Sequence, residues 1–337
     1  MKQLLKRADS SLFSGRLMRR WQQRYQDRCV QIICYHSVAR TPCVLTDGTA
    51  LCHTHDEFER QVDYFAERYR PMSLRRLIEC IAEGRSVDRA VVFTFDDGFA
   101  DNLRRAMPIL YRRRIPMTVF PTAGVIGNTD LMWTHKLAWL THQGHGDRLL
   151  KAMYSAGFRE REPDEAWPDY ARRVFRIDFP DLLEGLLRDA CKTGSGLARE
   201  LRPYLEPEEM AAVDPEFVEF GNHTLTHPVL ATLTASQQEA EIREGARIIG
   251  AITGVKPLAF AYPFGLKRHY TDETQQLVRA TGHLAALDMR RRINTGRLDP
   301  FQLSRRPAPH GPRELLDSLI APAPANAYLP HPNRSEA

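Results

Sequence analysis

Two adjacent carboxylates follow a strongly apolar run. Residues 91–95, with the sequence VVFTF, lead directly into Asp96, Asp97 and Gly98. This pattern is typical of a buried strand whose carboxyl end opens into a site. Because neighbouring carboxylates repel each other, burying them requires a cation or a shared proton. A metal ion is the simplest cation, although Asp-Gly is also ordinary turn chemistry and by itself fits a surface turn equally well.

A second motif, GNHTLTHP, follows a short strand candidate at 217–220. His223 and His227 are four residues apart, so a tight or helical turn places both imidazoles on one side. The proline that follows His227 disfavours continuation as a helix. Taken alone, the pair also fits a structural or surface role. Together with one aspartate of the adjacent pair it makes a three-ligand set with room for water, as in catalytic rather than structural zinc sites. Zinc is the expected ion, and cobalt, nickel or iron suits the same ligands.

The combination of TFDDG with HTLTHP resembles the polysaccharide deacetylases of the NodB-homology type, carbohydrate esterase family 4. Two further segments, YHSV at 35–38 and FAYPFG at 260–265, resemble the exopolysaccharide and poly-N-acetylglucosamine deacetylase branch. The resemblance covers most of the chain. It implies a distorted (β/α)7-type barrel, and it implies hydrolysis of an N-acetyl group on an amino sugar. Ala261 stands where the wider family has an arginine that orients the catalytic aspartate.

The resemblance also implies roles for individual residues. Asp96 is expected to be the general base, while the metal is held by Asp97 and the two histidines. The family places a backbone oxyanion donor at Phe264, with Tyr262 and Pro263 in the same motif. The general acid is expected to be His36, at the end of the first strand.

The sequence leaves the roles of the remaining site candidates open. His310 competes with His36 for the role of general acid. Arg305 is a candidate to approach the site and replace the missing arginine, although a basic surface residue is the alternative. The other histidines, including His53 and His135, are expected to be surface or loop residues without a direct catalytic role.

Apolar strand candidates alternate with helical stretches, which predicts an α/β fold with parallel strands. The predicted strands lie near 30–35, 91–95, 117–121, 217–220, 258–262 and 284–287. Predicted helices include 74–82 and 272–280, and a capping box at 234–237 starts another that ends at Gly254. In a barrel of this kind the active site lies after the strands. We divide the chain into a deacetylase barrel at 29–312, with a helical insertion at about 130–212, and a partly disordered segment at 313–337.

The first 28 residues carry eight Lys or Arg and two Asp, a net charge of +6, whereas the whole chain of 337 residues carries +5. This basic amphipathic segment suits peripheral contact with an anionic membrane surface, or a basic helix packed on the barrel. The nearly neutral remainder argues against nucleic-acid binding. Without a membrane-spanning run or a signal peptide, we expect a cytoplasmic protein, with peripheral contact at the inner membrane face as an open alternative.

The leading functional hypothesis is a metal-dependent N-deacetylase. Its expected substrate is an N-acetylated amino sugar in a polysaccharide, oligosaccharide or glycolipid. One alternative is a hydrolase of a different acyl group, such as formyl or O-acetyl. Another is a catalytically inactive glycan-binding homologue, which the replacement of the family arginine by Ala261 allows.

Overall fold

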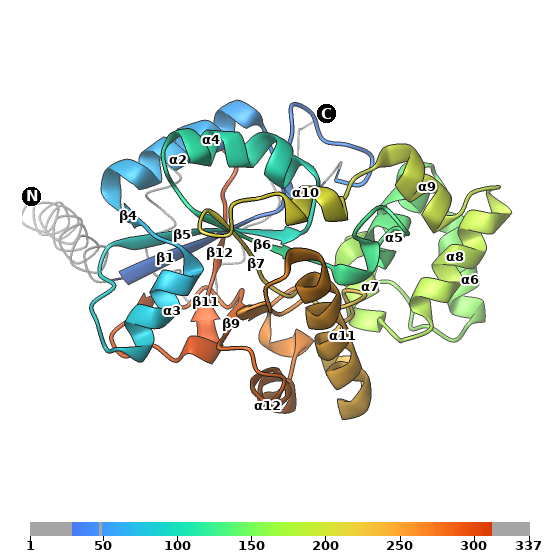
Figure 1. Cartoon of the computed structure of the whole chain (residues 1–337). Coiled ribbons are helices and arrows are strands. Elements are labelled where there is room, and N and C mark those ends of the chain that lie inside the picture. Colours follow the sequence, from blue (N-terminus) through green and yellow to red (C-terminus); the bar gives the residue numbers. More distant parts are fainter. Residues whose placement is uncertain (1–28, 47–48, 312–337) are drawn as a thin grey trace, which may run out of the picture.

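The computed structural model describes residues 29–46 and 49–311 (Figure 1). The basic segment predicted for residues 1–28 and the segment predicted for 313–337 lie outside the described residues. Among the helices that are described, none combines the length and the apolar character needed to cross a membrane.

The larger sheet is built around β5, whose eight residues, Ala90–Asp97, are all buried. Its strand order is β10-β1-β5-β6-β7, with β12 also pairing with β1 and β4 with β5. All these pairs are parallel except that between β1 and β10. The other strands of this sheet are β1 (Cys29–Tyr35), β4 (Arg70–Pro71), β6 (Met117–Pro121), β7 (Val218–Phe220), β10 (Asn294–Thr295) and β12 (Arg306–Pro307).

A smaller parallel sheet has the order β11-β9-β8, and a separate pair joins β2 to β3. The two larger sheets meet where Asn222, after β7, forms a bridge with Phe260 of β8. They meet again at Arg305, the single residue between β11 and β12. The described strands thus curve as an incomplete barrel wall and do not form one closed barrel. The bounds are β2 (Ser37–Val38), β3 (Cys52–His53), β8 (Ala259–Ala261), β9 (Ala285–Asp288) and β11 (Leu303–Ser304).

Helices alternate with the strands and cover the sheets on two sides. Figure 1 shows α2 and α4 above the larger sheet, and α3, α11 and α12 below. The predicted capping signals are confirmed: Thr234 and Gln237 form a capping box, and Gly254 ends α11 at φ 71°. The bounds are α2 (His55–Arg68), α3 (Leu74–Ala82), α4 (Met107–Arg112), α11 (Ala235–Thr253) and α12 (Asp272–Ala280).

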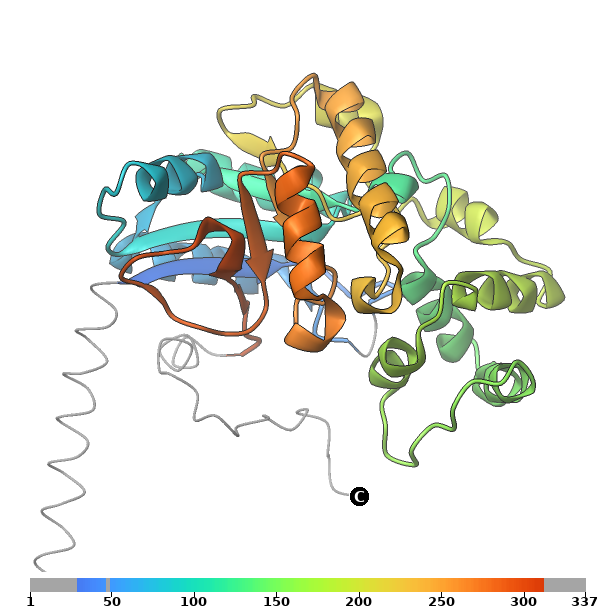
Figure 2. The same cartoon turned by 90° about the horizontal axis from the view of Figure 1, so that it is seen from below.

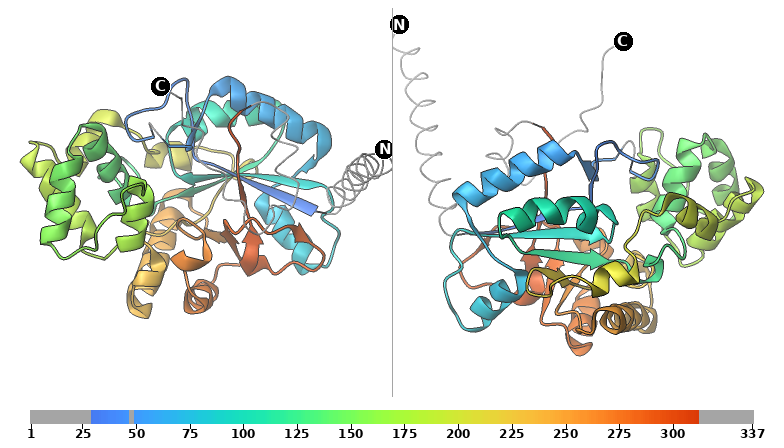
Figure 3. Two further views of the ribbon diagram at one scale, coloured as in Figure 1. Left: turned by 180° about the vertical axis from the view of Figure 1, so that it is seen from behind. Right: turned by 45° about the horizontal axis from the view of Figure 1, so that its top comes forward.

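Six helices lie between β6 and β7 in sequence. Figures 2 and 3 show α5 to α9 as a group beside the sheets, and most of these helices share an apolar core of their own around Leu140, Leu183 and Leu187. The same core includes Val125 and Val229 from the segments that follow β6 and β7, so the group is packed against the carboxyl ends of these strands. The bounds are α5 (Trp133–His142), α6 (Gly146–Ser155), α7 (Trp167–Val174), α8 (Phe179–Asp189), α9 (Gly194–Leu201) and α10 (Pro207–Ala211).

Candidate active site

The adjacent carboxylates end β5 and are buried. Asp96 pairs with Phe120 and Asp97 with Pro121 of β6, so both lie at the carboxyl end of the larger sheet. Here the chain turns sharply, with φ of 68° at Asp97 and 74° at Gly98. A Cβ at Gly98 would lie 2.7 Å from Cβ of Pro121. Only glycine therefore allows the turn that directs both acids into the site.

The loop after β7 brings His223 and His227 to the same place. Its conformation is held by short side-chain bonds: Asn222 Oδ1 accepts the Thr224 N–H at 3.0 Å, and Thr224 Oγ1 accepts the His227 N–H at 3.0 Å. Glu241 of α11 accepts the N–H of Thr226 at 2.8 Å. The backbone of His227 has a positive φ of 61°. Such a conformation is strained for a non-glycine residue, and here it turns the second imidazole toward the first.

Asp97 faces both imidazoles. Its Oδ1 lies 3.7 Å from His223 Nε2 and 3.5 Å from His227 Nε2. His223 Nδ1 donates to the Ala261 carbonyl at 2.8 Å, which leaves its Nε2 lone pair toward Asp97. The buried Oδ1 of Asp97 has no hydrogen-bond partner among the described residues. Lone pairs converging around an orphaned carboxylate oxygen fit a metal ion, and the His223–carbonyl bond is the kind that orients metal-ligating histidines.

The electrostatics of this cluster agree with that fit. Burial, followed by repulsion from Asp96, raises the pKa of Asp97 to about 8. Burial also lowers the pKa of both His223 and His227, so both imidazoles are neutral at pH 7. Among the described residues no cation contacts Asp97 directly, so a divalent ion would supply the positive charge that ionises this carboxyl and makes it a ligand beside the two neutral imidazoles. The structure thus brings together the three ligands predicted from the sequence.

Asp96 has a different partner. Arg305 is completely buried and donates two hydrogen bonds of 2.6 Å to Asp96, one from Nη1 to Oδ1 and one from Nη2 to Oδ2. The Arg305 N–H is itself fixed by the Asp288 carbonyl at 2.7 Å. Burial alone would raise the pKa of Asp96, but the Arg305 guanidinium outweighs it and holds the pKa well below its usual range. Arg305 therefore supplies the contact that the resemblance assigns to an arginine at position 261.

His36 lies beside Asp96, at the end of β1. A ring nitrogen of His36, Cys34 Sγ and an Asp96 oxygen all lie within 4.8 Å of one another. Its backbone is held by Asn102, whose Nδ2 donates to the His36 carbonyl at 2.6 Å. Burial lowers the pKa of His36 to about 4, against the opposing field of Asp96, so the imidazole is neutral at pH 7. The thiol of Cys34, 3.4 Å from Asp96 Oδ2, is a neighbour that sequence reasoning missed.

Two of the predicted residues lie apart from this cluster. The ring of His310 stacks on that of His53 at 4.0 Å, and its Nδ1 lies 3.4 Å from Glu57 at the start of α2. The side chain of Tyr262 is completely buried and stacks on Tyr270 at 3.9 Å, so it packs in the core under the site.

Phe264 does reach the cluster. Its ring lies 4.6 Å from the ring of His227, and its backbone has a φ of 61°, beside Gly265 at 65°. Pro263, between Tyr262 and Phe264, is buried and places the turn. From the insertion, Trp133 packs 5.9 Å from Phe264, and its Nε1 donates to the His227 carbonyl at 2.8 Å. Nothing in the local sequence signals that this tryptophan supports a loop 94 positions away.

Gly245 in α11 packs closely against the loop after β7 that carries His223 and His227, here called the histidine loop. A Cβ at Gly245 would lie 2.5 Å from Asn222 Oδ1 and 2.9 Å from the Thr224 carbonyl carbon. Alanine normally stabilises a helix relative to glycine by about 0.5–1 kcal/mol. For Gly245→Ala we expect the opposite, a net loss of stability with weaker metal retention, because overpacking costs about 1–3 kcal/mol.

The matched control for this prediction is Gly250→Ala in the same helix, where the nearest atoms would be 3.8 Å away. Denaturant unfolding and metal content are the measurements. Equal stability gains from both substitutions would contradict the close contact between α11 and the histidine loop.

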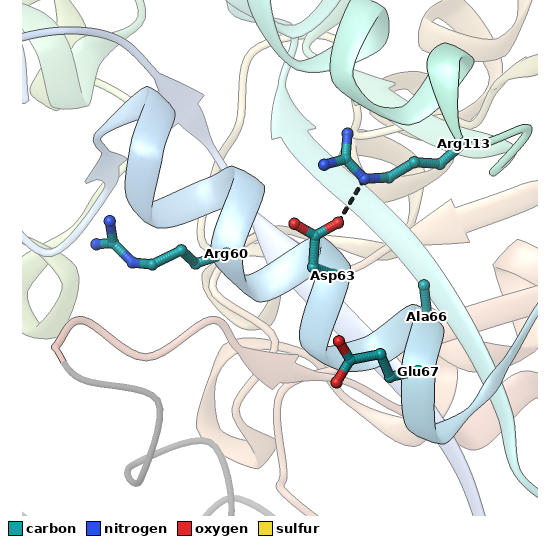
Figure 4. A pocket seen from close by; sticks show the side chains of 5 residues that line it. All are labelled: Arg60, Asp63, Ala66, Glu67 and Arg113. Carbon is teal, nitrogen blue, oxygen red and sulfur yellow. Dashed lines mark hydrogen bonds and ion pairs between the residues drawn. The ribbon is translucent and has the colours of Figure 1, made fainter.

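A surface hollow on α2 is not a candidate site. It is lined by Arg60, Asp63, Ala66, Glu67 and Arg113 (Figure 4). Asp63 Oδ1 accepts from Arg113 Nε at 2.6 Å, and Arg113 also pairs with Glu59 at 2.9 Å. These charges compensate one another on the outer side of the helix.

The family comparison agrees with the fold and the cluster. The family model described as polysaccharide deacetylase matches residues 83–161 and 189–286, more than half of the chain. These ranges contain both adjacent aspartates, both histidines of the loop after β7 and the FAYPFG motif. The fold and the matched residues define a carbohydrate deacetylase. The chain belongs to the polysaccharide deacetylase family, which confirms the resemblance found in the sequence.

Solved structures share the fold at low sequence identity. Streptococcus pyogenes deacetylase PplD in complex with acetate aligns with a TM-score of 0.58 and 18% identity, over 87% of this chain and 99% of that one. IcaB from Ammonifex degensii gives 0.57 and 18%, over 87% and 97%. BC0361, a polysaccharide deacetylase from Bacillus cereus, gives 0.56 and 16%, over 87% and 69%. No curated protein matches the chain in the sequence comparison.

Proposed function

We propose that this chain is a metal-dependent N-deacetylase that removes acetyl groups from an amino sugar in a polysaccharide, oligosaccharide or glycolipid. The observation that carries the proposal is the buried Asp97–His223–His227 cluster with an orphaned carboxylate oxygen at its centre, directly beside an aspartate held in its ionised form. The family membership supplies the deacetylation, and the cluster supplies the reason to expect a metal.

The three ligands would hold one divalent ion, with zinc as the expected metal. Such an ion would acidify a water molecule and polarise the acetyl carbonyl. The two neutral imidazoles are ready donors, Asp97 would lose its proton on binding the ion, and cobalt, nickel or iron fits the same set as zinc.

Asp96 acts as the general base in this proposal. Arg305 keeps its carboxylate ionised and fixes its orientation through two hydrogen bonds, so it is ready to accept a proton from water. Arg305 also opposes that protonation, which makes Asp96 a weak base that needs an acidified water.

His36 is the group that would protonate the leaving amine. Its imidazole is neutral beforehand, so the proton that Asp96 accepts from water would pass to His36, which lies beside it, and from His36 to the departing nitrogen. The backbone N–H of Phe264, in a turn with positive φ against His227, is the proposed donor to the developing oxyanion. Tyr262 has no direct contact with substrate in this scheme, and His310 has no part in it.

The test is product analysis with the purified full chain. N-Acetylglucosamine oligomers should release acetate and gain one free amine for each acetate. Acetate without new amine, from an O-acetylated glycan, would instead support the rival ester hydrolase, and formate from an N-formyl sugar would support a deformylase. Tight glycan binding without release of any acid would support the inactive homologue. The cytoplasmic location and the membrane contact stay predictions.

A further inference from the structure

The prediction that His135 is a surface or loop residue is wrong. It lies in the first turn of α5, and only 2% of it is exposed. Its ring lies 5.3 Å from that of Phe99, two residues after Asp97. The insertion therefore brings a fourth imidazole, in addition to His36 and the two loop histidines, to the carboxyl end of β5.

Tyr204 fixes the tautomer of this imidazole. The Tyr204 hydroxyl lies 2.5 Å from His135 Nδ1, and the same hydroxyl accepts the Met132 N–H at 3.1 Å. The Met132 amide is a donor and cannot take the hydroxyl proton, and His135 Nδ1 is the acceptor within its reach among the described residues, so the hydroxyl proton is directed to Nδ1. Burial keeps both groups neutral, because it raises the pKa of Tyr204 well above its usual value and lowers that of His135 to about 3. The ring proton of His135 must then be on Nε2, which makes Nε2 a hydrogen-bond donor.

That donor has no partner within the described part of the chain. His135 Nε2 takes part in none of the hydrogen bonds of the described residues, and it does not belong to the atoms that are both sealed from solvent and unpaired. It therefore keeps some contact with solvent, although the residue as a whole is buried. In His135 the Nε2–H is a donor in a fixed direction, because Nδ1 is held by Tyr204. Ligand sites typically contain a few polar groups placed in this way.

Two hydrogen bonds to backbone carbonyls connect the neighbours of His135 to the metal-ligand cluster. Trp133, two residues before His135, donates to the His227 carbonyl at 2.8 Å, so the first turn of α5 is attached to the histidine loop. On the other side, the N–H of Leu205, next to Tyr204, donates to the Gly98 carbonyl at 3.0 Å. Burial chiefly lowers the pKa of His135, and the neighbouring His36 lowers it further.

We infer that His135 is a substrate-binding residue, with Nε2–H donating a hydrogen bond to an oxygen of the bound amino sugar, and that the helical insertion thereby forms one wall of the site. The inference rests on the proposed function. The protonated nitrogen excludes a role as a fourth metal ligand in this tautomer. A neutral oxygen acceptor, such as a sugar hydroxyl or the acetamido carbonyl, is the matching ligand chemistry.

Two isosteric substitutions separate binding from folding. His135→Asn places an acceptor near Nδ1 for the Tyr204 hydroxyl but has no donor at Nε2, whereas His135→Gln places an amide donor near Nε2. We expect His135→Asn to lower kcat/KM on N-acetylglucosamine oligomers about 10- to 100-fold at unchanged metal content, because a buried polar contact to the substrate is lost. His135→Gln should recover most of this loss. The control is His142→Ala in the last turn of α5, expected to leave kcat/KM unchanged.

A binding measurement tests the inference even if the proposed reaction is wrong. In the Asp96→Asn background, calorimetry with an N-acetylglucosamine pentamer should show about 10-fold weaker binding when His135→Asn is added. Absence of acetate release by the wild type would overturn the proposed function and leave this comparison intact. Equal pentamer affinity with and without His135→Asn, or kcat/KM within about twofold of the wild type with only a lower melting temperature, would show that His135 is structural and overturn the inference.

Discussion

Asp96→Asn is expected to reduce acetate release about 10³-fold while the metal content stays at the wild-type level. The substitution keeps the shape of the side chain and removes the charge that accepts a proton. General acid–base groups contribute roughly 10²- to 10⁴-fold, and Asp96 also holds Arg305 through two bonds of 2.6 Å. Metal content and acetate release on the same sample are the measurements.

A matched control is Asp63→Asn on the outer side of α2, where the carboxylate pairs with Arg113 away from the site. It should leave both quantities unchanged. An Asp96→Asn enzyme with more than a tenth of wild-type activity would exclude Asp96 as the base. Loss of metal from this variant would instead make Asp96 a ligand.

Arg305→Met is expected to destabilise the fold by about 3–5 kcal/mol, because it leaves the Asp96 carboxylate buried without its counter-charge. The activity that remains should have its acidic limb at higher pH. The direction of this shift follows from two opposing effects on the pKa of Asp96. Arg305 lowers this pKa, and burial raises it once the guanidinium is gone. Denaturant unfolding and the pH profile of kcat/KM measure the two effects.

The double variant Asp96→Asn with Arg305→Met should recover part of the lost stability, since neither charge is then left alone. Arg306→Met, at the next position, removes a buried arginine that makes no contact with Asp96 and should leave the pH profile in place. An unchanged acidic limb in Arg305→Met would contradict the role of the Arg305 guanidinium.

The strand-end residues could be predicted from the sequence because their signals are local. An apolar run that ends in Asp96 and Asp97 already places both acids at the end of a strand, and the spacing of His223 and His227 brings the two imidazoles together within one short loop. That the loop meets β5 follows from parallel strand pairing, which aligns carboxyl ends at one edge.

The supporting residues have weaker signals: Arg305 is a candidate in the sequence because it follows a late strand, whereas the position of His135 was not predicted. Arg305 meets Asp96 from 209 positions away, and only the closing of the wall by β11 and β12 brings them together. His135 lies in the helical insertion, and no sequence pattern indicates how these helices pack against the barrel strands. Its partner Tyr204 is 69 positions distant, at the opposite end of that insertion. Long-range contacts of this kind depend on how the helices and strands pack, and no local pattern in the sequence predicts that packing.

The metal content of the wild-type chain and of Asp97→Ala, measured together with acetate release, tests the proposed centre most directly. We predict about one divalent transition-metal ion per wild-type chain, and loss of both the ion and acetate release in Asp97→Ala. A wild-type protein that releases acetate at full rate after complete removal of metal by a chelator would contradict the metal-dependent mechanism.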